Sequence, residues 1–157
     1  MIDHDGYRPN VGIVLANAED QVFWARRCRC DGWQFPQGGI QREETAEDAL
    51  FRELYEEVGL ESRQVQICGR TQGWLRYDLP RAYQRSGGRH RFRGQKQVWF
   101  LLRLTGCDAD VRLDASASPE FDAWRWVDYW SPIDAIVDFK RKVYEMALTE
   151  LAPLLRR

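Results

Sequence analysis

Three glutamates are spaced so that one helix would bring their carboxylates together: Glu53, Glu56 and Glu57. Thr45 followed by Asp48 is typical of a capping box at a helix start, and Gly59 is typical of the left-handed residue that ends a helix. Side chains three and four residues apart lie on one side of such a helix. Clustered carboxylates without nearby His or Cys favour Mg²⁺ or Mn²⁺ over Zn²⁺. The spacing therefore predicts a metal-binding helix.

A solvated acidic face is the ordinary explanation of a glutamate run. Here four apolar residues share the sector that holds the glutamates: Ala46, Ala49, Leu50 and Leu54. Like charges beside a buried face are unfavourable unless a counter-charge is supplied. The upstream turn at Gly38 and Gly39 would also let backbone come close to a ligand. We therefore expect a bound divalent cation.

The same stretch resembles the Nudix box at every fixed position: Gly38, Glu44, then Arg52-Glu53-Leu54-Tyr55-Glu56-Glu57-Val58-Gly59-Leu60. Nudix enzymes cleave nucleoside diphosphates linked to another group. The resemblance implies that the three glutamates are metal ligands, that Arg52 orients them, and that the backbone carbonyl of Gln37 is a further ligand. It also implies the Nudix fold, a mixed β-sheet sandwiched between α-helices.

The elements that must position this helix are mostly strands. Apolar and alternating runs predict strands within residues 11–15, 21–26, 65–69, 73–77, 98–104 and 123–127. The run at 98–104 is the strongest and is expected at the sheet centre. A capping box from Ser131 to Asp134 predicts a short helix, and a longer one is expected from Lys140 through Leu155. This order predicts an α+β fold in one domain, residues 1–157.

Composition and charge exclude several classes of protein. The net charge of -1 gives no global attraction to nucleic acid. No apolar run approaches the roughly 18 residues that span a bilayer, and no signal peptide precedes Tyr7. The four cysteines form no C-x-x-C pair, which argues against a zinc site. We expect a cytoplasmic protein with free thiols and no membrane contact.

Arginine is used far more than lysine. Of 23 basic residues only three are lysines, so 20 are arginines. The planar guanidinium suits bidentate phosphate contacts and stacking on bases, but a biased genome explains the excess equally well. The arginines at 26, 27 and 29 fit either a solvated strand end or a phosphate-binding segment. The arginine-rich segment Pro80–Gly94 is expected to be a mobile loop, either a plain polar surface or a contact for single-stranded nucleic acid.

Further segments resemble the bacterial RNA pyrophosphohydrolase group of the Nudix family: residues 7–12, 33–39, 94–97, 119–122 and 139–141. That group removes pyrophosphate from triphosphorylated RNA 5′ ends, and close relatives hydrolyse diadenosine polyphosphates. The resemblance implies two sets of substrate contacts. The expected phosphate contacts are Arg8, Tyr77 and Gln95, and the expected contacts to a nucleotide near the 5′ end are Arg27, Phe139 and Lys140.

Several alternatives stay open at this point. By resemblance Glu120 completes the metal cluster or acts as general base, whereas its residue type alone indicates a surface position at a strand start. Phe139 alone reads as a core residue at a helix start, and Tyr77 as a strand aromatic. RNA 5′ triphosphate ends are the expected substrate, dinucleoside polyphosphates the alternative. A non-catalytic nucleotide- or RNA-binding module is the competitor from another class, and the complete set of box glutamates argues against it.

Overall fold

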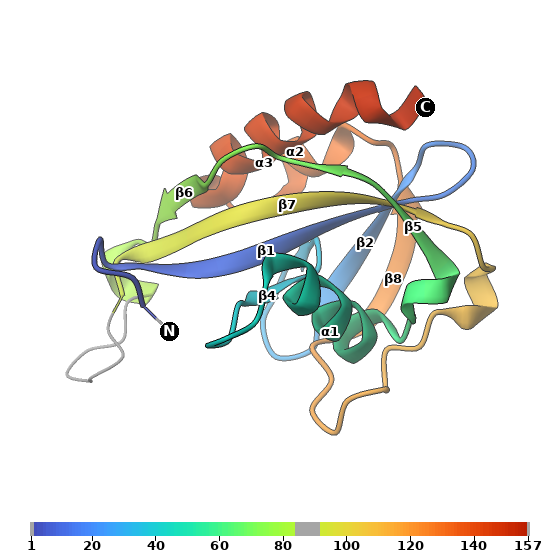
Figure 1. The fold of residues 1–157 in the computed structure, drawn as a ribbon, viewed down its shortest axis with the longest axis horizontal. Helices are drawn as coiled ribbons and strands as arrows, with labels where there is room; N and C mark the ends of the chain where they lie inside the picture. The colour runs from blue at the N-terminus through green and yellow to red at the C-terminus, as the bar shows by residue number, and fades with distance from the viewer. Residues whose placement is uncertain (1, 84–91, 157) are drawn as a thin grey trace.

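The computed structural model describes residues 2–83 and 92–156 of the chain (Figure 1). In chain order the strands and helices are β1 (Tyr7–Ala16), β2 (Val22–Arg27), β3 (Trp33–Gln34), β4 (Gln37–Gly39), α1 (Ala46–Val58), β5 (Val65–Arg70), β6 (Leu75–Asp78), β7 (Gly94–Leu104), β8 (Phe121–Val127), α2 (Ser131–Ala135) and α3 (Asp138–Leu151). Single 3₁₀ turns at Ser62–Gln64, Arg81–Tyr83, Asp108–Asp110 and Ala152–Arg156 complete the described elements.

A parallel pair, β1 and β7, forms the centre of the sheet. The two strands run side by side from Tyr7 opposite Gly94 to Ala16 opposite Arg103. The sheet continues in the order β3-β2-β1-β7-β5, while β4 pairs with β1, β6 with β7 and β8 with β2. The other pairings among the described strands are antiparallel. The mixed sheet and the central place of residues 98–104 are confirmed, and β1 starts at Tyr7, earlier than the strand expected at Val11.

Helices cover both faces of this sheet, with α1 on one face and α2 and α3 on the other (Figure 1). Side chains of a strand alternate between its two faces, so each central strand serves two cores. Val11 and Phe100 pack in the core under α1, whereas Val14, Trp99 and Leu101 pack in the core under α3. The α+β sandwich that the sequence predicts is confirmed.

Helix α1 has the predicted start and end. The Thr45 Oγ1 accepts the Asp48 amide at 3.0 Å, and the Asp48 carboxylate accepts the Thr45 amide at 3.1 Å. Gly59 ends the helix with φ of 78°. The two caps fix the helical turn on which each glutamate lies, so they set which carboxylates face the sheet.

The C-terminal helices differ from expectation in their starts. Trp130, not Ser131, is the N-cap of α2, and the Ser131 hydroxyl donates to the Asp128 carbonyl at 3.0 Å. The predicted capping box is therefore wrong, because the turn begins one residue earlier and leaves Ser131 inside the helix. Helix α3 begins at Asp138 and ends at Leu151, where a 3₁₀ turn replaces the last expected α-helical residues.

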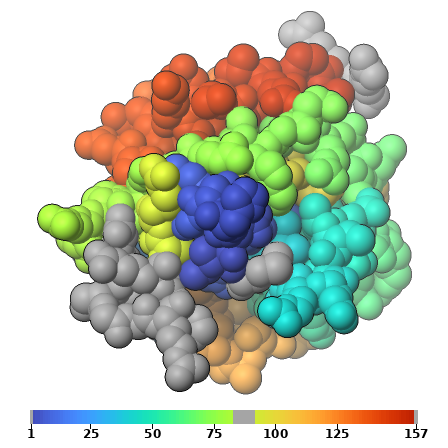
Figure 2. Space-filling view, turned by 60° about the vertical axis from the view of Figure 1, so that its left-hand side comes forward, coloured from blue at the N-terminus to red at the C-terminus, as the bar shows by residue number. Residues whose placement is uncertain are grey.

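The remaining expectations concern the loop, the thiols and the membrane. Most of the arginine-rich loop lies at residues 84–91, outside the described part of the chain. All four cysteines are free, as expected. None of the described helices has the length and apolar character needed to cross a bilayer. Figure 2 shows the N-terminal segment, in blue, at the surface between the green β5–β6 region and the cyan start of α1.

Candidate active site

A cleft of about 720 Å³ gathers most of the residues that the sequence singled out. Ten of the twelve predicted site residues line it: Arg8, Arg27, Gln37, Glu53, Glu57, Tyr77, Gln95, Glu120, Phe139 and Lys140. They come from β1, β2, β4, α1, β6, β7, α3 and the residue before β8. The other two, Arg52 and Glu56, are not among the lining residues, and Arg52 pairs with both Glu53 and Glu56.

Arg52 is the centre of the polar contacts around the acidic helix. Its Nε and Nη2 donate to both carboxylate oxygens of Glu44, at 2.6 and 2.9 Å. Its Nη1 donates to Glu53 at 2.7 Å and lies 3.5 Å from a Glu56 oxygen. Nη2 also donates to the Gly39 carbonyl at 2.8 Å. One guanidinium thus connects helix α1, Glu44 in the segment before it and strand β4 through charge-assisted hydrogen bonds.

Glu57 is the most deeply placed carboxylate of the cleft. Its side chain is buried, and Oε1 accepts the Gln37 amide at 3.1 Å. Burial raises the pKa of Glu57 well above the ordinary value of 4.5, and the nearby Glu53 and Glu120 carboxylates raise it further. Burial also raises the pKa of Glu53, although Arg52 opposes the shift. These carboxylates are held close to one another at a cost that a cation would relieve.

Strand β4 comes very close to this cluster. A Cβ on Gly38 would overlap the Glu53 carboxyl group, and a Cβ on Gly39 would collide with the Arg8 guanidinium. Only glycine fits at either position without moving a side chain of the cleft. The two glycines therefore let β4 lie against an acidic group on one side and a basic group on the other.

The donor set fits a hard divalent cation. Carboxylate and carbonyl oxygens are the ligands that Mg²⁺ and Mn²⁺ take, and the cleft offers them from Glu53, Glu57 and Glu120. Cys30 is the one cysteine among the described lining residues. As the side chains stand in the described residues, no three His, Cys, Asp or Glu groups form a complete metal cage. The contacts of Arg52 explain why the carboxylates do not converge on one point, because the Glu53 and Glu56 carboxylates are both drawn toward its guanidinium.

Cationic side chains face the acidic group across the cleft. The Lys140 Nζ lies 3.4 Å from Gln37 Oε1 and 3.5 Å from Gln34 Oε1. Burial, with repulsion from Arg27, lowers the pKa of Lys140 to about 8. The Arg27 Nε and the Gln95 Oε1 are buried without a hydrogen-bond partner in the described part of the chain. Unpaired buried polar atoms of opposite kinds, a donor and an acceptor, indicate a polar ligand between these walls.

An aromatic pair forms the remaining side of the cleft. The Phe139 and Tyr77 rings lie 5.9 Å apart between centroids, and the Lys140 ammonium lies 5.7 Å from the Tyr77 centroid. Phe139 also packs against the core under α3, as its residue type alone indicates. Tyr77 is buried, and burial raises the pKa of its hydroxyl to about 12, so the phenol stays neutral.

Sequence reasoning missed several lining residues, among them Gln34 and Val137. Gln34 accepts from Lys140, and Val137 is 45% exposed at the cleft mouth beside Phe139. Neither residue type signals a site. Their only clue is position, since each lies within a few residues of a predicted site residue.

Known proteins resemble this chain along nearly its whole length. The NUDIX domain family model matches residues 6–147. A protein of Alkalilimnicola ehrlichii named RNA pyrophosphohydrolase is 63% identical over 155 residues, which cover 99% of this chain and 86% of that protein.

Two solved structures have the same fold. The E. coli dihydroneopterin triphosphate pyrophosphohydrolase gives a TM-score of 0.71 at 20% identity, covering 92% of this chain and 98% of that chain. A C. elegans Ap4A hydrolase binary complex gives 0.67 at 20% identity, covering 94% and 98%. At this level of identity the structures support the fold alone.

Proposed function

This chain belongs to the Nudix family of hydrolases, and on that premise we propose that it removes pyrophosphate from 5′-triphosphorylated RNA and leaves a 5′-monophosphate. The 63% identity to an RNA pyrophosphohydrolase over nearly the full chain carries this proposal. A cleft with cationic, acidic and aromatic walls supports it, because an RNA 5′ end offers phosphates and a base to the same site.

Nudix hydrolases depend on a divalent metal ion, and we propose Mg²⁺ here, with Mn²⁺ as a substitute. The residues that would hold it are Glu53, Glu56, Glu57, Glu120 and the backbone carbonyl of Gln37. When bound, such an ion supplies charge neutralisation at phosphate oxygens and a lower pKa for a bound water. Arg52 keeps Glu53 and Glu56 within reach of this place through its contacts to both carboxylates.

The basic residues bind the triphosphate in this proposal. The Arg8 guanidinium lies against Gly39 of β4 and lines the same cleft as Glu53 and Glu57. Arg27 offers its unpaired Nε to a phosphate oxygen, Gln95 lines the same cleft, and Lys140 adds a third positive charge. Together these groups hold the phosphate chain so that water can attack a phosphorus atom and pyrophosphate can leave. Glu120 either completes the metal ligands or accepts the proton of the attacking water.

The first bases of the RNA need a flat surface, and Phe139 offers it. Its ring is half-buried at the start of α3 and lies beside Tyr77. A base stacked there would gain about 1–3 kcal/mol, the usual range for aromatic stacking in single-strand recognition. Arg27 and Lys140 flank the same wall and would contact the base edge or its phosphate.

A competition in Mg²⁺ buffer tests the proposal. A short 5′-triphosphorylated RNA and diadenosine pentaphosphate are mixed at equal concentration, and released pyrophosphate and nucleotide products are followed together. Faster RNA turnover is expected. Preference for the dinucleotide would favour the alternative, a dinucleoside polyphosphate hydrolase, whereas turnover of neither substrate would indicate a binding module.

Variants show whether the box glutamates perform the reaction. Glu53→Gln and Glu56→Gln are expected to abolish turnover while melting temperature stays near that of the parent. The matched control is Glu61→Gln, because Glu61 is exposed and its one ion pair among the described residues is with Arg63, at 2.9 Å. A Glu53 variant that keeps most of its activity would contradict the metal role.

A further inference from the structure

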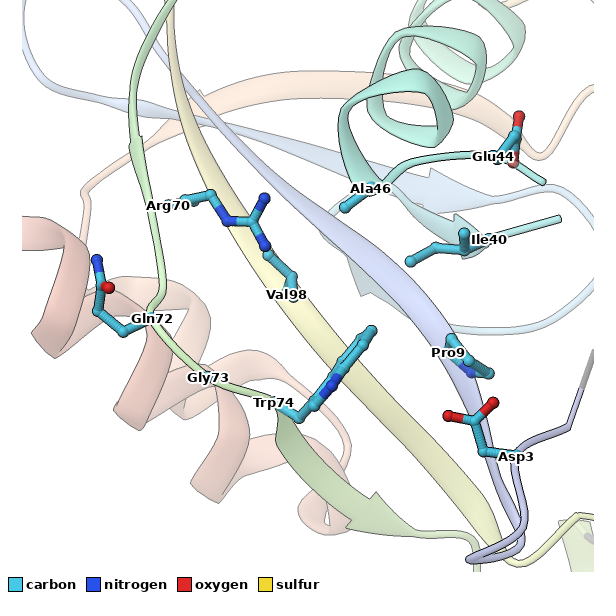
Figure 3. Close-up of a pocket in the computed structure, with 10 residues that line it drawn as sticks. All are labelled: Asp3, Pro9, Ile40, Glu44, Ala46, Arg70, Gln72, Gly73, Trp74 and Val98. Atoms are coloured by element: carbon cyan, nitrogen blue, oxygen red, sulfur yellow. The ribbon is translucent and has the colours of Figure 1, made fainter. Parts of the chain in front are cut away.

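A second groove lies on the α1 face of the sheet, away from the candidate active site. Its volume is about 360 Å³, within the range of roughly 300–1,000 Å³ that small-molecule sites occupy. Figure 3 shows Arg70 and Trp74 reaching over β7 from the β5–β6 side, opposite Ile40 and Ala46. Pro9 and Val98 form the floor between them. The two cavities have no lining residue in common.

The charges of this groove favour an anion. Its two acids already have partners, since Asp3 pairs with Lys96 and Glu44 pairs with Arg52. Arg70 makes no ion pair with any residue in the described ranges. Its guanidinium instead lies 5.2 Å from the centroid of the Phe100 ring, which holds it at the groove wall. A fixed and unpaired guanidinium is suited to a phosphate or carboxylate.

Trp74 adds a surface for a planar ring. The side chain is 38% exposed although it is large and apolar, and the Lys96 ammonium lies 5.1 Å from its ring centroid. Its indole N–H has no hydrogen-bond partner within residues 2–83 and 92–156. The ring thus offers both a stacking face and a free donor, which a nucleobase with its acceptor atoms can use.

We propose that this groove binds a free mononucleotide, with the base against Trp74 and the phosphate at Arg70. A nucleotide within an RNA chain offers the same chemistry. The groove shares no lining residue with the active-site cleft, however, and the aromatic wall of that cleft, at Phe139, packs against the core under α3. A separate small ligand is the occupant that this arrangement favours.

The groove also touches the contacts that hold the acidic helix. Glu44 lines it and accepts two hydrogen bonds from Arg52, whose third nitrogen binds Glu53. A ligand phosphate at Arg70 therefore lies in the same cavity as the carboxylate that anchors Arg52. A ligand in the groove can therefore affect the position of Glu53 through the Glu44–Arg52 and Arg52–Glu53 contacts. Any such coupling is reciprocal, so binding at the active site would change the affinity of the groove by the same factor.

Calorimetric titration of adenosine 5′-monophosphate, without divalent metal, tests the site. The protein carries Arg27→Ala and Phe139→Ala, so that binding in the active-site cleft is removed. In this background we expect binding to persist, and added Arg70→Ala or Trp74→Leu to weaken it at least about tenfold. Trp74→Phe keeps a ring and should weaken it less. Arg63→Ala is the matched control for Arg70→Ala, because Arg63 is exposed and outside the groove.

The ligand series identifies what is recognised. Adenosine and ribose 5-phosphate should each bind more weakly than the nucleotide, because each lacks one of the two contacts. Loss of binding in the Arg27→Ala, Phe139→Ala background would overturn the proposal, and so would unchanged binding when Arg70→Ala or Trp74→Leu is added to that background. The groove would instead be an RNA contact if the mononucleotide does not bind at millimolar concentration but a 5′-monophosphorylated tetranucleotide does, in a manner that depends on Trp74. That result would overturn the proposal.

Discussion

The carboxyl group of Glu53 lies so close to the Cα of Gly38 that a Cβ on Gly38 would overlap it. We therefore expect Gly38→Ala to push Glu53 out of place while the chain still folds, since the displaced atoms are the far end of a flexible side chain. A misplacement of about 1 Å at a reacting centre costs roughly 100-fold in rate, and a loss of that order in kcat is expected. Steady-state kinetics and thermal unfolding, measured together, check both parts.

Gly73→Ala is the control for this substitution, because a Cβ on Gly73 meets no atom within 4 Å. It adds the same methyl group in the segment just before β6 and should leave kcat unaltered. A Gly38→Ala enzyme with the parent kcat would mean that the contact between Gly38 and Glu53 has no bearing on the reaction.

Glu44→Gln tests the support of Arg52. The glutamate binds two nitrogens of Arg52, so the substitution removes a negative charge that shares the guanidinium with Glu53 and Glu56. Arg52 should then compete more strongly with a cation for both carboxylates. Groups that orient metal ligands are typically worth about 10–100-fold in metal affinity or activity. The Mg²⁺ concentration for half-maximal rate is expected to rise by that factor.

The control for Glu44→Gln is Glu61→Gln, which removes one charge from an exposed pair with Arg63. It should leave the Mg²⁺ dependence unchanged. An equal response of the two variants would mean that net charge, and not the contact of Glu44 with Arg52, governs metal binding.

Helix α1 could be predicted from the sequence because its signals are local. Thr45, Asp48 and Gly59 set the ends of α1, and the spacing of the glutamates then follows from helix geometry. The central strand at 98–104 was equally readable from its apolar run. The resemblance to the Nudix family likewise rested on one continuous stretch, Gly38 to Leu60.

Contacts across the sheet could not be predicted in the same way. Lys140 approaches Gln34 across 106 positions of sequence, and no residue pattern marks that pair. The parallel register of β1 and β7 likewise depends on long-range packing. Glu44 was recognised as part of the box, but its role as the anchor of Arg52 required the folded geometry. Strand order and side-chain partners thus depend on tertiary packing that a single sequence does not encode locally.

Phe139→Ala should impair RNA hydrolysis more than diadenosine pentaphosphate hydrolysis. The substitution removes the stacking surface for a base near the 5′ end and leaves the phosphate contacts in place. A rise in KM for RNA of about tenfold or more corresponds to the lower part of the stacking range. Phe51→Ala, on the opposite side of the sheet, controls for lost core packing. Equal effects of Phe139→Ala on both substrates would argue for a purely structural ring.

Glu57 should make the metal-free protein less stable as pH rises. Its folded pKa lies well above the ordinary value of 4.5, so between these two values the folded chain holds a proton that the unfolded chain has lost. The associated stabilisation is fully present below 4.5 and is lost as pH rises through the folded pKa. Melting temperatures from pH 4.5 to 8 in chelator should therefore fall more steeply for the parent than for Glu57→Gln.

Glu47→Gln is the control for Glu57→Gln, since it alters an exposed glutamate in the first turn of the same helix. It should keep the parent slope. Added Mg²⁺ should flatten the parent curve, because a cation favours the ionised carboxylate. Parallel curves for the parent and Glu57→Gln would show that Glu57 ionises at its ordinary pKa.

Lys140 should make substrate affinity depend on pH near neutrality. Because its pKa is lowered to about 8, the ammonium that faces the phosphates loses its proton within the working range. KM for triphosphorylated RNA is expected to rise from pH 7 to 9 in the parent. Lys140→Arg keeps its charge and should flatten that rise, whereas Lys140→Gln should raise KM at pH 7 and remove the dependence. An unchanged rise in Lys140→Arg would assign the titration to another group.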